Sequence, residues 1–140
     1  MLSGLTASCL CLAASMNSSG FETAQKERDA AWLTKYPVIQ DMMKLQNKER
    51  ARYGLAALTM NREMCLAAQK HAEWMSKTGY YVHSNLPWPE IIHSGPTTAA
   101  GAVTGWIYSP SHHGIMLTGR TAGFGYAKRN GATYWVTVIQ

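Results

Sequence analysis

The sequence has too few cysteines for a disulfide framework. Three occur among its 140 residues, and Cys9 and Cys11 lie in an apolar N-terminal stretch that would leave with a signal peptide. The third, Cys65, stands between Met64 and Leu66 in a helical pattern. A thiol in that setting is expected to be a small buried hydrophobe rather than an activated nucleophile. The small secreted scaffolds that depend on several disulfides are therefore excluded.

Long apolar runs are also lacking. The run at residues 5–14 is too short to span a bilayer but has the length of a signal-peptide core, although no basic residue precedes Lys26. The alternatives are a merely apolar N-terminus, or a lipid attached at Cys9, for which the preceding residues fit poorly. We expect a signal peptide at residues 1–16, a polar linker at 17–29 and one folded domain at 30–140. This organisation predicts a secreted or extracytoplasmic protein with no transmembrane segment.

Acidic residues and dense basic runs are scarce. Asp and Glu number 8 against 13 Lys and Arg, which gives a net charge of +5. The densest basic stretch, KERAR at residues 48–52, contains a glutamate and is expected to form a solvated helix face. No nucleic-acid groove is predicted. The motifs HExxH, GxSxG and CxxC and glycine-rich phosphate loops do not occur.

The sequence does contain enough apolar residues, 46%, for one folded core. Apolar periodicity predicts a helix from about residue 30 to residue 53, with Pro37 early in it and Gly54 after its end. A second helix is predicted from a cap at Asn61 to a stop at Gly79. Its His71 falls on the apolar stripe, where a hydrogen-bonded core histidine is expected rather than a ligand.

The second half of the chain predicts shorter elements. We expect a strand near residues 80–83, a third helix begun by one of the threonines at 97–98, and a short helix opened at 109–110. The Asn-Gly pair at residues 130–131, flanked by alternating residues, predicts a terminal β-hairpin. Helices first and a hairpin last indicate an α+β fold with helices packed on a small, mostly antiparallel sheet.

Six polar residues are candidates for chemistry. They are His83, Glu90, His93, Ser109, His112 and His113. Two histidines and a carboxylate can hold zinc with an open coordination position, or can act as general acid and base. Glu90 and His93 are three residues apart, a spacing that would bring them together on a helical turn. Ordinary surface histidines are the alternative interpretation of the same residues.

Five segments in order resemble the CAP superfamily, which comprises the cysteine-rich secretory proteins, the insect-venom antigens and the pathogenesis-related proteins of plants, also called SCP domains. The segments are "LQNKERARYGLAALTMNREMCLAAQKHAEWM", "HS", "E-I-I-x-x-G", "W-I-Y-S-P-S-H" and "GFGYA…YWVTVI", within residues 38–140. The resemblance implies a CAP-like α-β-α sandwich with a shallow central cleft.

In that family the cleft carries two histidines and two acids. His83 resembles the first histidine, and Glu90 resembles a family glutamate, here without its usual glycine and asparagine neighbours. The second glutamate would fall at Ser109, so this acid is missing, as in short bacterial members. His112 then resembles the second histidine, and His113 stands where such members often carry arginine.

The loss of one acid favours weak, reversible binding of a divalent metal such as zinc, through His83 and His112, over catalysis. The resemblance implies a secreted binding module for a lipid, sterol or protein ligand, with a cleft formed by His83, Glu90, Ser109 and His112. One alternative is a protease-like hydrolase that uses His83, Glu90 and His112, with Ser84 or Ser109 as the nucleophile. The other is a structural or toxin-like surface protein whose cleft is vestigial.

Overall fold

The computed structural model describes residues 18–140, so the expected signal peptide at residues 1–16 lies outside the described part, as do Cys9 and Cys11. Within residues 18–140, the helices and strands follow one another in the order α1 Ser18–Leu33, α2 Pro37–Arg52, β1 Thr59–Met60, α3 Arg62–Thr78, β2 Glu90–Ser94, α4 Ala99–Ile107, α5 Pro110–Met116, β3 Thr121–Arg129 and β4 Ala132–Ile139. None of these helices is both long and apolar enough to cross a membrane.

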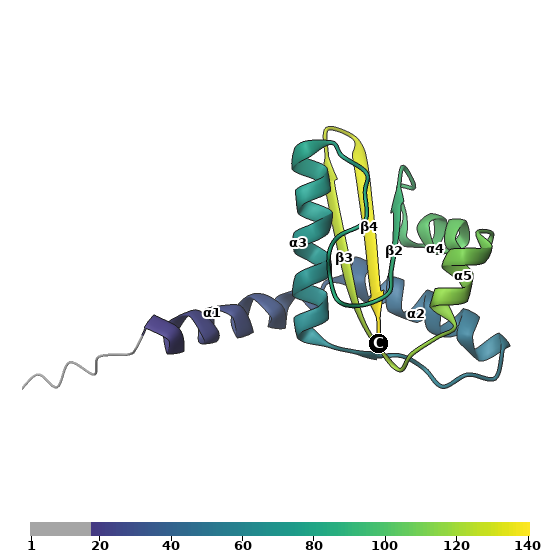
Figure 1. Ribbon diagram of the computed structural model, residues 1–140, viewed down its shortest axis with the longest axis horizontal. Helices are drawn as coiled ribbons and strands as arrows, with labels where there is room; N and C mark the ends of the chain where they lie inside the picture. Colours follow the sequence, from purple (N-terminus) through teal and green to yellow (C-terminus); the bar gives the residue numbers. More distant parts are fainter. Residues whose placement is uncertain (1–17) are drawn as a thin grey trace, which may run out of the picture.

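The strands form one sheet in the order β1-β3-β4-β2. β1 runs parallel to β3, whereas β3 with β4 and β4 with β2 pair antiparallel. α3 packs against β3 and β4 on one face of the sheet, and α2, α4 and α5 lie on the other face (Figure 1). The expected α-β-α sandwich with a mostly antiparallel sheet is therefore confirmed.

Alternation along β4 divides the core into two parts. Tyr134, Val136 and Val138 join the apolar cluster under α3, while Trp135 and Ile139 join the cluster under α2, α4 and α5. Successive side chains of a strand point to opposite faces, so one strand supplies both clusters. This buried strand fixes β2 beside it, and β2 carries the first residue of the candidate site.

Two glycines of β3 allow α3 to lie directly on the sheet. A Cβ added at Gly123 would stand 2.1 Å from the carbonyl carbon of Met64, and one at Gly125 would stand 2.3 Å from that of Ala68. Real Cβ atoms do not approach a backbone so closely, so side chains at these positions would push α3 away. The close contact sets the height of α3 and of the loop that follows it.

The local signals for element ends are confirmed. Asn61 caps α3 by accepting a hydrogen bond from a backbone N–H, and Thr98 caps α4 in the same way. Gly79 ends α3 with φ 76°. Asn130 and Gly131 have φ 50° and 81°, the positive values that a tight hairpin turn of type I′ requires.

The first predicted helix begins earlier than expected and is interrupted. Residues 18–29, assigned above to a linker, form the first turns of α1, since they are rich in good helix formers although they lack an amphipathic pattern. A turn then separates α1 from α2, which starts at Pro37 with Tyr36 as its N-cap. Proline has no N–H to donate and therefore begins a new helix instead of continuing the old one.

Two further expectations are wrong. The strand expected near residues 80–83 is irregular loop, and the strand of this region is β2 instead. The KERAR segment is not a solvated face throughout, because Glu49 and Arg50 are 4% and 3% exposed. The Arg50 guanidinium donates hydrogen bonds to four carbonyl oxygens, those of Ala56, Met116, Thr118 and Gly119. Arg50 thus supplies hydrogen-bond donors to the carbonyl groups of two chain segments that meet at the end of α2.

β2 lies at one edge of the sheet. Two side chains donate hydrogen bonds to the backbone carbonyl oxygen of its central residue, Ile92. The carbonyl oxygen of Ile92 accepts hydrogen bonds from Tyr81 Oη at 3.0 Å and from Trp106 Nε1 at 2.9 Å. One donor comes from the loop after α3 and the other from α4. These bonds hold both elements against β2.

Candidate functional site

Glu90 is the centre of the site that the structure assembles. It is the first residue of β2, and its side chain is 6% exposed. Three donors reach its carboxylate: Nδ1 of His83 at 2.9 Å, the backbone N of Ser84 at 2.8 Å, and Oγ of Ser84. Because a carboxylate only accepts, Nδ1 of His83 carries a proton and the neutral ring leaves Nε2 free for a ligand.

The loop from residue 79 to residue 89 brings His83 to this carboxylate. Gly79 turns the chain out of α3, and two further hydrogen bonds anchor the returning segment. His71 Nε2 lies 2.8 Å from the carbonyl oxygen of Val82, and Tyr81 Oη donates to Ile92 on β2. His83 itself is 56% exposed in its side chain. Glu90 thus fixes the Nδ1 edge of the imidazole, while more than half of the side chain is open to solvent.

His112 comes to the same site from α5. It is half-buried, and its pKa is lowered first by this burial and then by the positive charges of His83 and His93 when they are protonated. α5, which carries His112, packs against β2, which carries Glu90 and His93. The structure therefore brings His83 and Glu90 into direct contact and places His112 on the helix that packs against the strand of Glu90.

His93 faces α4 rather than Glu90. Its Nε2 occupies the space above Gly105, where an added Cβ would come within 2.3 Å, and its ring is tilted against Trp106. The idea that Glu90 and His93 meet on a helical turn is wrong, because β2 is a strand and residues three apart point to opposite faces. His93 is not among the hydrogen-bond donors to Glu90.

Neither serine is placed as a nucleophile. Ser109 is the N-cap residue of α5, yet its side chain makes no capping hydrogen bond. Within residues 18–140, no hydrogen bond or ion pair joins Ser109 to His83, Glu90 or His112. Ser84 Oγ is engaged by Glu90 and also accepts from the backbone N–H of Leu86. Ser84 thus shapes the loop, and no imidazole activates either hydroxyl.

Sequence reasoning missed a hydrogen-bonded pair that joins α5 to α2. His113, treated above as a flank, places Nε2 2.9 Å from Oε1 of Glu49 on α2, and the edge of Tyr53 packs against its ring. Arg52 binds the other oxygen of Glu49. The sequence did contain a signal for this pair. Glu49 is the acid of the KERAR segment, and His113 stands where related chains carry a basic arginine, so the two could have been predicted to pair.

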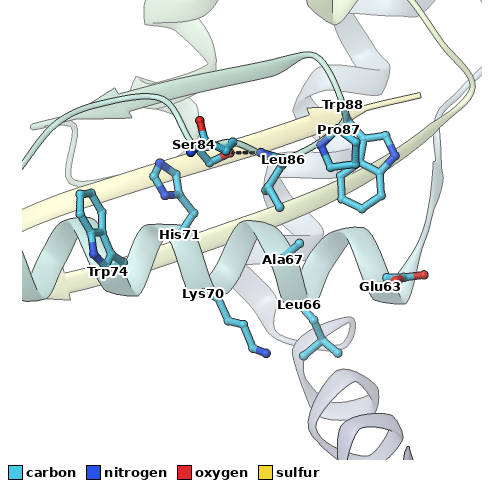
Figure 2. A pocket seen from close by; sticks show the side chains of 11 residues that line it. Glu63, Leu66, Ala67, Lys70, His71, Trp74, Ser84, Leu86, Pro87 and Trp88 are labelled. Atoms are coloured by element: carbon cyan, nitrogen blue, oxygen red, sulfur yellow. Dashed lines mark hydrogen bonds between the residues drawn. The ribbon is translucent and has the colours of Figure 1, made fainter.

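A groove adjoins the site along α3. It has a volume of about 730 Å³, and Leu86, Pro87 and Trp88 from the loop face Ala67 and His71 on α3 (Figure 2). A second hollow of about 310 Å³ shares His71 with the groove and reaches His83. His71 is half-buried in this wall, so it is hydrogen-bonded as expected but is not a core residue.

The donor set limits how a metal can be held. Among residues 18–140, no group of three or more His, Cys, Asp or Glu side chains is arranged to hold a metal ion. Glu90 already accepts three hydrogen bonds and fits the role of the carboxylate that orients a metal-binding histidine. The residues described do not fit a structural zinc site with four protein ligands.

Comparisons with known proteins agree with this architecture. The chain matches the Cysteine-rich secretory protein family, CAP, over residues 43–140. A search of the curated proteins gives no match.

Solved structures of other proteins have a similar fold. An extracellular SCP-domain protein of Bacillus anthracis is 18% identical with a TM-score of 0.59, and the alignment covers 73% of this chain and 40% of that one. An outer surface protein of Borrelia burgdorferi is 18% identical with a TM-score of 0.61, covering 70% and 90%. Hookworm platelet inhibitor is 15% identical with a TM-score of 0.56, covering 71% and 66%.

At these identities the likeness concerns the fold alone. The chain spans less than half the length of the Bacillus protein that it matches, the covered share being 40%. The family match covers most of the chain and includes His83, Glu90 and His112. The chain therefore belongs to the CAP family of cysteine-rich secretory proteins.

Proposed function

We propose that this chain is an extracytoplasmic CAP-domain binding module whose site is centred on His83, Glu90 and His112. The observation that carries the proposal is the buried Glu90 carboxylate, which fixes Nδ1 of His83 and leaves Nε2 free. A histidine oriented by a carboxylate is the arrangement that proteins use to present an imidazole to a metal or to a polar ligand group. The extracellular and outer-surface neighbours support the proposed location.

The metal that we propose is a divalent cation such as zinc, held weakly and reversibly. Two imidazoles and solvent molecules would complete its coordination, and Glu90 would hold His83 in position from behind. The metal would supply a Lewis-acidic centre for a polar ligand group. His112 would need to be neutral to bind, and its lowered pKa favours that form at neutral pH.

The ligand class that we propose is a lipid, sterol or protein segment. The apolar groove along α3 supports this class, because it continues into the hollow that reaches His83. A ligand with an apolar part in the groove and a polar part near His83 would use both surfaces. The protease-like alternative gains no support, since Ser84 is bound to Glu90 and no imidazole activates it.

The test is a zinc titration by calorimetry at about pH 7.5 and about pH 5.5, on either side of the ordinary imidazole pKa of about 6.5. We expect binding to the wild type at the higher pH, weaker binding at the lower pH, and none in the double variant His83→Ala/His112→Ala. His113→Gln is the control, because His113 is turned toward Glu49 and should not bind the metal. A folded wild type that takes up no zinc would refute the metal site.

A further inference from the structure

Aromatic side chains gather at the end of the sandwich where α3 stops. Trp74, Tyr80, Tyr81 and Val82 are 43%, 67%, 49% and 48% exposed, and all lie within nine residues of one another. The Trp74 ring stacks with His71 at a centroid distance of 5.7 Å and with Tyr80 at 6.3 Å. Exposed apolar residues that cluster in this way mark an interaction surface.

The same end of the molecule is basic. Lys77 lies in the last turn of α3, and Lys128 and Arg129 end β3 at the hairpin; all three are exposed. They come together because β3 runs along α3 in the same direction: Gly125 lies over Ala68, and the last turns of α3 reach the hairpin (Figure 1). The aromatic and basic residues therefore share one end of the sandwich.

Acidic residues are nearly absent from this end. Glu73 is the only acid between residues 64 and 89, and residues 123–140 contain none. Glu73 is half-buried, and its carboxylate accepts a hydrogen bond from Gln69. Within residues 18–140, no ion pair involves Lys77, Lys128 or Arg129. Three cations without an ion pair among the described residues thus lie at the same end of the sandwich as the aromatic cluster.

We propose that this end docks on the surface of an anionic lipid bilayer. Tryptophan and tyrosine favour the headgroup region, where the ring is in an apolar setting and the polar atom stays wet. Lysine and arginine beside them attract anionic headgroups, at short range because salt screens the field.

This proposal deepens the binding role proposed above by naming a partner. Trp74 also lines the groove and the hollow beside His83, whereas Tyr80, Lys128 and Arg129 line neither. None of Trp74, Tyr80, Lys128 and Arg129 contacts Glu90. Loss of zinc binding would therefore leave membrane docking unaffected, and loss of docking would leave zinc binding unaffected. The zinc site and the docking surface can therefore fail separately, and Lys128 and Arg129, which line neither the groove nor the hollow, test the docking surface alone.

The experiment is co-sedimentation of the full chain with vesicles of phosphatidylcholine, with and without phosphatidylglycerol. We expect binding to the vesicles that contain phosphatidylglycerol and little to the others. Lys128→Ser/Arg129→Ser should weaken that binding roughly 25-fold, since each cation near such a surface contributes about 1 kcal/mol and 1.4 kcal/mol is tenfold. Trp74→Ala should weaken it roughly tenfold.

Two matched variants separate this surface from the rest of the molecule. Lys44→Ser/Lys48→Ser removes the same charge from exposed positions on α2, and Trp32→Ala removes a tryptophan that is 53% exposed on α1. Both should bind within about twofold of the wild type, because distant charges are screened. Circular dichroism verifies that every variant is folded.

A second measurement places the contact at Trp74. Brominated lipids quench tryptophan only at short range, so quenching on binding should fall in Trp74→Phe while sedimentation is kept. No sedimentation of the wild type with phosphatidylglycerol would overturn the proposal. Equal losses in the two double variants, equal binding to both kinds of vesicle, or unchanged quenching in Trp74→Phe would also overturn it.

Discussion

Nε2 of His113 lies 2.9 Å from Oε1 of Glu49, and this contact joins α5 to the last turn of α2. The side chains are 19% and 5% exposed, so the pair is largely removed from water. Arg52 reaches the second oxygen of Glu49 from solvent, with 70% of its side chain exposed. The carboxylate consequently depends on His113 for its one shielded partner.

Replacing His113 by alanine should lower the free energy of unfolding by about 1–3 kcal/mol, because a buried carboxylate oxygen would lose its partner. His113→Gln can still donate to Glu49 and should recover much of this loss. Urea unfolding measures the differences. Arg52→Ala is the control and should cost about 0.5 kcal/mol or less, as exposed pairs do. Equal costs for His113→Ala and Arg52→Ala would contradict the role given to His113.

Gly123→Ala should destabilise the sandwich by about 2–3 kcal/mol, because the new methyl group would strike the backbone of α3 at Met64. The control is Gly114→Ala on α5, where nothing lies within 4 Å of the added Cβ. That change should stabilise the protein by up to about 1 kcal/mol, since alanine is the better helix former. Thermal unfolding of the two variants checks the opposite signs; a harmless Gly123→Ala would mean that α3 does not rest on β3.

Stability should fall on acidification partly through His112. Its folded-state pKa is lowered from 6.5 by burial and by His83 and His93. The unfolded chain therefore binds the proton more readily, and the contribution of His112 is fully present above about pH 6.5 and lost as the pH falls toward the folded-state pKa. In chelator, the wild type should lose more stability between about pH 7.5 and about pH 5 than His112→Gln does. If the stability of the two proteins fell in parallel with pH, His112 would not contribute to the pH dependence.

Glu90→Gln should weaken zinc binding about 10–100-fold while leaving both histidines in place, because a neutral amide would replace the charged acceptor that orients the His83 ring and raises its basicity. Ser84 would also exchange its hydrogen bonds to a charged carboxylate for weaker ones to a neutral amide, so the melting temperature should fall. Calorimetry and thermal unfolding measure the two effects. Glu63→Gln, at an exposed position on α3, is the matched control. Zinc affinity unchanged by Glu90→Gln would mean that His83 needs no such support.

The parts of the fold that could be predicted are those encoded locally. The caps at Asn61 and Thr98, the stop at Gly79 and the turn at Asn130-Gly131 depend on a few neighbouring residues, and all were confirmed. Local chemistry of this kind survives in the fold because each residue satisfies a backbone group within a few positions of itself.

The parts that could not be predicted depend on contacts between distant segments. Arg50 is buried because carbonyl groups about 70 residues away converge on it, and no helix pattern reveals that partnership. The two-residue strand β1 exists only because β3 lies beside it. The helix α1 lacks an apolar stripe, so periodicity does not distinguish it from a linker.

The candidate site shows the same division. The resemblance of motifs named His83, Glu90 and His112. The structure joins His83 in a loop to Glu90 on a strand, and it places His112 on a helix that packs against that strand. The tautomer of His83, the engagement of Ser84 and the turn of His93 toward Gly105 follow from the folded geometry. They could not be read from spacing, because the prolines of the loop and the strand character of β2 override helical distances.

The two hydrogen bonds on the carbonyl oxygen of Ile92 also bear on how the molecule avoids others of its kind. An edge strand with free acceptors invites a second chain to extend the sheet, which is a common route to aggregation. On β2 the central acceptor is already occupied by the side chains of Tyr81 and Trp106. An incoming strand would have to displace both. The same bonds that hold the loop in place thus protect the sheet against growth from this edge.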